Sequence, residues 1–132
     1  MKTLKLTLTK KWFDMILNQE STLVKKQEYR EIKEFWIRRF VENHSPEHIS
    51  NEQIKETLLN PKDGDVFDTE WCELLYFPLI EFTNGYGKHR PSFIIKAEPI
   101  KVGYGKPEWG AVEGEKYFVL NLLEIVSTSN IK

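Results

Sequence analysis

The stretch from Lys25 to Lys33 constrains the fold most, because it places alternating cations and anions in a segment with strand character. Successive side chains of a strand point to opposite faces, so Lys26, Glu28 and Arg30 are predicted to share one face. Burying an unpaired charge costs several kcal/mol, so that face is predicted to meet water, an ion-pair network or a ligand. The alternative interpretation is a solvated edge strand whose charges prevent aggregation.

The composition is that of a folded protein with one domain. The 132 residues suffice for a hydrophobic core that needs no disulfide or structural metal to stabilise it. They include four Trp, eight Phe and five Tyr, which is more than a disordered chain carries. The lone cysteine, Cys72, excludes an intrachain disulfide and is predicted to be a small core residue. The start of the chain lacks a signal peptide's apolar run, and no segment approaches the roughly 20 apolar residues of a membrane span. We therefore expect a single domain over residues 1–132, in the cytoplasm and without a membrane partner.

The charged residues are distributed unevenly along the chain. Residues 1–40 carry ten basic and five acidic side chains, whereas residues 41–81 carry two basic and ten acidic ones. Residues 82–132 carry seven basic and five acidic side chains, and the net charge of the whole chain is −1. A protein that binds a long duplex is usually more basic than this. The pattern favours a small ligand, such as a nucleotide or a short single strand.

Besides the charged strand, local patterns in the first half predict one more strand and three helices. Residues 3–8 alternate between apolar and polar, as in a half-buried strand, and Thr9 is placed to cap a helix over residues 12–17. A second helix is expected at residues 35–41, and Ser50–Gln53 is a capping-box pattern that opens a third. The side chains expected to face the core are Leu4, Leu6, Leu8, Trp12, Phe13, Ile16, Leu17, Ile54 and Leu58.

The second half of the chain is predicted to be β. Residues 72–82 form an apolar run, and Asn84-Gly85 is a strong hairpin signal before an alternating strand at residues 93–97. Pro99 marks an edge or bulge, and residues 116–126 supply the last long strand. We therefore predict an α+β fold, in which a small, strongly bent sheet closes into a barrel and helices pack outside it or across one end.

The loop at residues 83–91 combines glycines with cations. Glycine lets backbone N–H groups approach an anion, and Lys88 and Arg90 beside Tyr86 would complete the cradle. A hairpin with a basic tip is the structural alternative. The same Gly-Tyr-Gly-Lys letters recur at residues 103–106, and we interpret the repetition as a coincidence of turn chemistry.

Two further candidates have plain structural alternatives. Trp109, in the compact Pro-Glu-Trp-Gly-Ala connection, is either a core plug or an exposed platform on which a base stacks, and burial is the more common fate of tryptophan. His44 and His48 have the i, i+4 spacing of helical zinc ligands, but Pro46 lies between them. We therefore predict no metal site.

At this point the chain resembles a known family. The helix at residues 12–17, followed by Lys25-x-x-Glu28-x-Arg30, is similar to the Gly-x-Lys-x-x-Glu-x-Arg signature of ASCH domains, which belong to the PUA-like barrels. The Asn-Gly-Tyr-Gly loop with Arg-Pro-Ser-Phe after it, and Pro-Glu-Trp-Gly-Ala before a Tyr-Phe-Val-Leu strand, resemble a small-protein branch of that family. The resemblance extends from residue 3 to about residue 126.

The resemblance implies a bent β-barrel of about five or six strands with two to three flanking helices. It also implies a cleft between helix and barrel that binds RNA or nucleotides and is lined by Lys25, Glu28 and Arg30. Arg30 would clamp a phosphate or carboxylate, Glu28 would hold Arg30 or accept a proton, and Lys25 would supply a compact cation.

The chain departs from the family pattern at two positions. Leu23 occupies the place of the motif glycine, so Lys26 is an alternative to Lys25 as the motif lysine. An amidohydrolase branch that acts on acylated cytidine is similar but has Thr where this chain has Glu28, and a carboxylate fits that nucleophilic mechanism less well. Ribonuclease activity is also associated with the family.

The sequence thus predicts a protein that binds a nucleotide or single-stranded RNA, without a cofactor. The alternatives are a hydrolase of modified nucleosides or a ribonuclease, with Lys25 and Glu28 as its catalytic groups, and a protein-interaction module. The predicted ligand-binding residues are Lys25, Lys26, Glu28, Arg30, Tyr86, Lys88, Arg90 and Trp109. The oligomeric state is left open.

Overall fold

The structure is a computed structural model that describes residues 3–19, 24–45, 49–61, 71–85 and 89–131. The chain divides into two compact units, each built from discontinuous segments. The first unit comprises residues 1–28, 77–99 and 120–132, and the second comprises residues 29–76 and 100–119. The expectation of a single domain over residues 1–132 stays a prediction.

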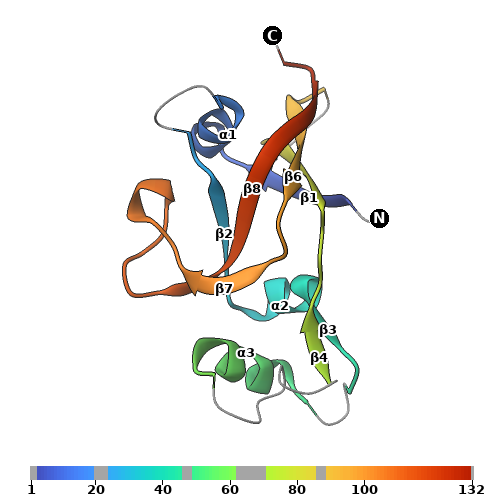
Figure 1. Cartoon of the computed structure of the whole chain (residues 1–132), viewed down its shortest axis with the longest axis vertical. Helices are drawn as coiled ribbons and strands as arrows, with labels where there is room; N and C mark the ends of the chain where they lie inside the picture. Colours follow the sequence, from blue (N-terminus) through green and yellow to red (C-terminus); the bar gives the residue numbers. More distant parts are fainter. Residues whose placement is uncertain (1–2, 20–23, 46–48, 62–70, 86–88, 132) are drawn as a thin grey trace. The chain divides into compact units, whose positions relative to one another are not determined.

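The fold is α+β, with a mixed sheet that curls as a half-barrel and three helices (Figure 1). One further strand, β7 (Lys101–Tyr104), pairs off the main path of the sheet with β8 (Lys116–Ser129). The predicted bent sheet of five or six strands is confirmed. In order across the sheet, the strands are β1 (Thr3–Leu8), β5 (Leu79–Asn84), β6 (Ser92–Ala97), β8 (Lys116–Ser129) and β2 (Gln27–Glu31).

The core of the first unit lies under helix α1 (Lys10–Leu17). Strand β1 runs parallel to β5, and the alternating leucines of β1 are buried as predicted. The Phe13 ring of α1 lies 4.9 Å from the Phe93 ring of β6. Thr9 is the residue before the helix, but its side chain makes no capping hydrogen bond, so that part of the prediction was wrong. Register shifts between β6 and β8 bend this part of the sheet.

The second unit contains α2 (Glu34–Phe40), α3 (Asn51–Leu59) and a separate two-stranded sheet of β3 (Val41–Asn43) and β4 (Cys72–Leu74). The apolar run at residues 72–82 is therefore two strands rather than one. Pro78 lacks an N–H group and interrupts the run, and the Leu75 N–H donates to the carbonyl of Phe40 at 2.8 Å. Burial raises the pKa of the Cys72 thiol above its ordinary value of 9.0, as expected of an inert core cysteine.

Helix α3 begins at the predicted capping box. The Gln53 N–H donates to Ser50 Oγ at 3.2 Å, and the Ser50 N–H donates to Gln53 Oε1 at 2.8 Å. Ile54 and Leu58 are buried, as the spacing predicts. These two side chains fix the face that α3 turns toward the core of its unit.

The predicted hairpin after Asn84 is present, since β5 and β6 pair antiparallel. Gly85 has a φ of +72°, in the left-handed region that glycine adopts without strain. The connection extends over residues 85–91, so it is longer than a two-residue turn. In the described part of the chain, no helix has the length and apolar character needed to cross a membrane.

Candidate functional site

Lys25 and Glu28, the first two residues of the motif, form a buried ion pair in the first unit. The Lys25 Nζ lies 3.1 Å from Glu28 Oε1, and the two residues are only 1% and 4% exposed. The same ammonium lies 4.1 Å from the centroid of the Trp12 ring. The Lys25 N–H donates to the carbonyl of Met15 at 2.8 Å, which anchors the lysine to the end of α1.

Of the three interpretations of the charged segment, an ion pair applies to Glu28, and its partner is Lys25 rather than Lys26, the residue predicted to share its face. Lys26 is exposed, and its backbone carbonyl accepts a hydrogen bond of 2.9 Å from the Leu122 N–H. The two charged groups are almost fully buried and already paired, so they are less accessible to a ligand than exposed side chains would be. Contact between a ligand and these two side chains stays a prediction.

Arg30, the third motif residue, belongs to the second unit and is half-buried. Its guanidinium lies 5.1 Å from the Trp36 ring and donates to the carbonyl of Tyr29 at 2.9 Å. Arg39 lies 5.4 Å from the same ring. Arg30 thus takes part in an aromatic cluster of the second unit, and the cleft expected to unite it with Lys25 and Glu28 stays a prediction.

The residues of the basic glycine loop are described only in part. Tyr86 and Lys88 lie outside the described residues. The guanidinium of Arg90 donates to the carbonyl of Gly85, and its own carbonyl accepts a hydrogen bond of 3.4 Å from Asn130 Nδ2. These contacts give Arg90 a structural role in closing the loop. They leave its predicted anion contact untested.

Trp109 lies in the 3-10 turn η2 (Pro107–Trp109) and is half-buried. It packs against a small core cluster in the second unit, and the Lys106 Nζ lies 4.6 Å from its ring centroid. This placement resembles the core plug more than the free stacking platform. The cluster consists of Tyr29, Ala111, Tyr117 and Val119.

The second unit also contains a hollow of about 490 Å³ that the sequence did not predict as a site. Helix α3 supplies one wall, and the end of β2 and the paired strands β7 and β8 supply others. Its volume is within the usual range of small-molecule pockets, roughly 300–1,000 Å³. The lining residues are Glu31, Ile32, Lys55, Leu59, Asn60, Tyr104, Gly114, Glu115, Lys116 and Tyr117.

An exposed aromatic ring and a lysine lie together in this hollow because of the strand register. Tyr104 and Lys116 are direct partners across β7 and β8, and the Lys116 Nζ lies 5.8 Å from the Tyr104 ring. Tyr104 is 64% exposed, whereas Lys116 is held by a hydrogen bond of 2.8 Å to the Leu59 carbonyl. The hollow therefore has an exposed aromatic side chain next to a positioned cation.

The charges that line the hollow are balanced. Lys55 and Lys116 are opposed by Glu31 and Glu115, and Glu115 Oε2 accepts a hydrogen bond of 3.1 Å from the Tyr117 hydroxyl. Lysines can contact a phosphate, while carboxylates can accept hydrogen bonds from base amino groups or ribose hydroxyls. The arrangement suits a ligand that carries both a single anionic group and several donors.

Comparisons of this chain with protein-family models, curated proteins and solved structures found no match.

One sequence signal could have located the hollow. The second Gly-Tyr-Gly-Lys copy, at residues 103–106, contains Tyr104, and its tyrosine is flanked by two residues without side chains. The contribution of Lys55 and Lys116 had no such signal, because they are 61 residues apart and come together only through the packing of α3 beside β8. His48, half of the histidine pair considered for zinc, lies outside the described residues.

Proposed function

We propose that this protein binds a nucleotide or a short single-stranded RNA, with one base against Tyr104 and one phosphate near Lys55 or Lys116. The observation that carries the proposal is the exposed Tyr104 ring beside a fixed lysine in a hollow of nucleotide size. Stacking of a base on an aromatic side chain contributes about 1–3 kcal/mol and tolerates any base. Sequence-tolerant binding of modest affinity follows.

The balanced charge of the hollow restricts the ligand further. Two lysines facing two glutamates leave no net positive charge for a chain of phosphates, whose binding depends on a surplus of cations. A nucleoside, a nucleoside monophosphate or a few nucleotides of single strand suits the hollow better than a nucleoside triphosphate or a duplex. The net charge of −1 for the whole chain agrees with this small footprint.

The resemblance of the sequence to ASCH domains supports the same class of ligand, and we propose that the chain is a small PUA-like domain of that kind acting in the cytoplasm. The α+β fold with a curled sheet is compatible with this proposal. In the proposed arrangement, Lys25 and Glu28 organise the interior of the first unit. They are not assigned a direct ligand contact, because both are buried.

The proposal is tested by equilibrium titration of labelled short RNAs and nucleoside monophosphates. We expect Tyr104→Ala to weaken binding at least about fivefold and Tyr104→Phe to retain it, because the phenylalanine ring still stacks. Tyr76→Ala is the matched control, since Tyr76 is another exposed tyrosine of the second unit, at 55% exposure. The logarithm of the affinity should fall with the logarithm of salt with a slope of about −0.7 per phosphate contacted.

Two outcomes would contradict the proposal. One is binding that Tyr104→Ala leaves unchanged relative to Tyr76→Ala. The other is the absence of saturable binding to every member of the panel while circular dichroism shows that the protein is folded. Association with other proteins that is insensitive to salt would instead favour an interaction module.

A hydrolase of modified nucleosides is the second candidate, and one observation favours it. The Lys25 side chain is almost fully buried, with its ammonium 3.1 Å from a carboxylate and 4.1 Å from the centroid of an indole ring, and buried lysines serve as catalytic groups in some enzymes. Release of product from acylated nucleosides, measured by chromatography, would support it if Lys25→Met abolished turnover in a protein that remained folded. Absence of turnover by the unmodified protein would exclude it for those substrates.

A further inference from the structure

The two-stranded sheet of β3 and β4 places two carboxylates opposite each other. Glu42 and Glu73 are direct cross-strand partners, and both are exposed. Side chains at such positions have Cβ atoms about 4.5–5.5 Å apart, and like charges there destabilise the pair. A cation between the two carboxylates would relieve this repulsion.

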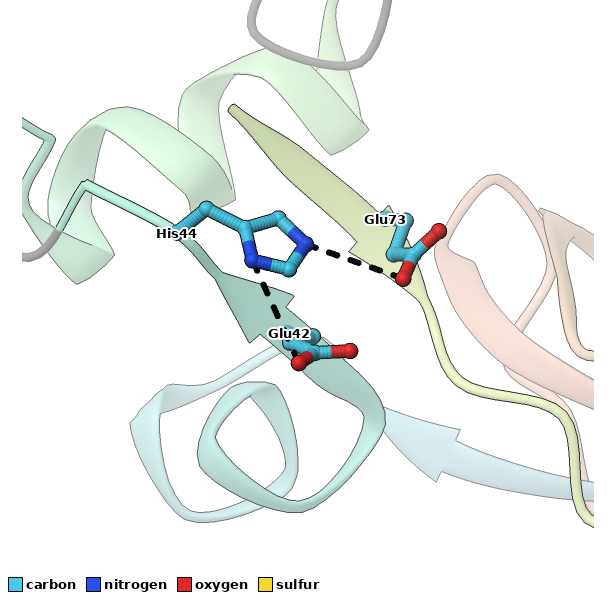
Figure 2. Close-up of side chains that lie close together, drawn as sticks. All are labelled: Glu42, His44 and Glu73. Carbon is cyan, nitrogen blue, oxygen red and sulfur yellow. Dashed lines mark ion pairs between the residues drawn. The ribbon is translucent and has the colours of Figure 1, made fainter. Parts of the chain in front are cut away.

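His44 lies between the two glutamates, as Figure 2 shows. Its Nδ1 lies 4.0 Å from Glu42 Oε1, and its Nε2 lies 3.7 Å from Glu73 Oε1. His44 follows the last residue of β3 directly, and its ring lies near both carboxylates. With one ligand atom taken from each residue, the three atoms lie within 4.8 Å of one another.

We propose that Glu42, His44 and Glu73 bind a divalent transition-metal ion of the zinc class, with water as the fourth ligand. An imidazole nitrogen and two carboxylate oxygens are a donor set that Zn²⁺ accepts in tetrahedral geometry. The histidine disfavours Mg²⁺ and Ca²⁺, which prefer oxygen ligands only. The two carboxylates neutralise the double charge of the ion.

The geometry requires only a small closure. Bonds from Zn²⁺ to nitrogen and oxygen are about 2.0–2.2 Å, so the ligand atoms of a tetrahedral site lie about 3.4 Å apart. The three ligand atoms are already within 4.8 Å. The three side chains are 45–63% exposed, so they can rotate to close the remaining distance and an ion can reach them from solvent.

The backbone beneath these side chains is held in place. The His44 N–H donates to the Trp71 carbonyl at 2.7 Å, and the Leu75 N–H donates to the Phe40 carbonyl at 2.8 Å, one at each end of the ribbon. Asn43 Nδ2 donates to the Ile49 carbonyl at 2.9 Å and steadies the chain that leaves β3. The ion would therefore join two strands already in register, and it would act as a clip across the ribbon.

Calorimetric titration with Zn²⁺ and visible absorption with Co²⁺ test this site. We expect one ion per chain, a Co²⁺ spectrum of four-coordinate type, and a loss of affinity of at least about tenfold in His44→Ala and in Glu73→Gln. Amide hydrogen exchange provides a second readout, because Zn²⁺ should slow exchange at His44 and Leu75. The variants alter exposed side chains, so circular dichroism should show an unchanged fold.

Matched controls distinguish this site from non-specific metal binding to other exposed side chains. His89→Ala removes another exposed histidine, and Glu113→Gln removes an exposed carboxylate of the second unit, so both should bind Zn²⁺ as the unmodified protein does. The proposal is overturned if His44→Ala binds as tightly as His89→Ala, or if the unmodified protein shows neither Zn²⁺ heat nor Co²⁺ absorption. This outcome is independent of nucleotide binding, which involves none of the three residues.

Discussion

Lys25 and Glu28 show at the scale of single residues how a charged sequence can lie in a protein interior. Removing two charges from water costs several kcal/mol for each ion, and their mutual attraction offsets that cost only with good geometry. Here the separation of 3.1 Å and the indole ring at 4.1 Å from the ammonium supply such geometry. Each charge can therefore be buried only because the other compensates it.

Removal of one partner should therefore be much more harmful than removal of both. We expect Lys25→Met to lower the free energy of unfolding by about 3–5 kcal/mol, because it leaves Glu28 as an uncompensated buried charge. The double variant Lys25→Met/Glu28→Leu should recover most of that loss. Urea denaturation followed by tryptophan fluorescence gives the free energy of unfolding of the unmodified protein, the single variant and the double variant.

The control for this cycle is an ion pair on the surface of the same unit. Lys96 lies 3.2 Å from Glu124 with both side chains more than half exposed, so Lys96→Met should change the free energy of unfolding by less than about 1 kcal/mol. A Lys25→Met variant no less stable than Lys96→Met would show that Lys25 and Glu28 are not coupled in a dry environment.

At the scale of elements, the repeated Gly-Tyr-Gly-Lys letters serve different purposes. Gly85, just before the first copy's tyrosine, needs a positive φ of +72°. Gly103 lies in strand β7 and has open space where a Cβ would stand. Gly105 is required for close packing, because a Cβ there would lie 2.6 Å from both the Ala111 Cβ and the Tyr29 Cζ. Tyr86, Gly87 and Lys88 lie outside the described residues, so the interpretation of the repetition as a coincidence stays a prediction.

The two glycines flanking Tyr104 provide a matched pair of substitutions. Gly105→Ala should lower the free energy of unfolding by about 1–3 kcal/mol, because it forces the Tyr29 ring away and strains the 2.9 Å hydrogen bond from the Lys106 N–H to the Tyr29 hydroxyl. Gly103→Ala should cost far less. Thermal unfolding of both variants checks the difference, and equal losses would contradict the proposed packing.

Most elements were predictable because their signals are local. The capping box at Ser50, the alternating leucines of β1 and the hairpin after Asn84 each lie within a few residues, and each was confirmed. The division of residues 72–82 into β4 and β5 was missed, because β4 exists through its pairing with β3, some thirty residues earlier. Strand pairing between residues so far apart cannot be predicted from the pattern of a short sequence segment.

At the scale of the whole molecule, the candidate site was less predictable than the fold. The motif residues were singled out by their charge, and the structure shows that Lys25 and Glu28 form an ion pair with each other inside the first unit. The hollow in the second unit unites α3 with β7 and β8, elements far apart in the chain. The same holds for Glu73, which joins His44 only because β4 lies beside β3.

The distribution of charge along the chain also bears on the ligand. Residues 41–81, which supply α3 to the hollow, carry ten acidic and two basic side chains, and Lys55 is one of those two. A ligand rich in phosphate would meet Glu31 and Glu115 as well as the lysines, whereas a base and a single phosphate would meet mainly Tyr104 and the lysines. The charge of the chain therefore favours a small ligand for the same reason as the hollow does, namely the absence of a surplus of positive charge.

The most direct test of nucleotide binding is a map of backbone amide chemical shifts in the ¹⁵N-labelled protein during titration with nucleoside monophosphates and a short single-stranded RNA. We predict saturable shifts centred on Lys55, Asn60, Tyr104, Glu115 and Lys116, which surround the hollow. Absence of saturable shifts for every ligand, or saturable shifts confined to other parts of the chain, would contradict the assignment of the hollow as the binding site.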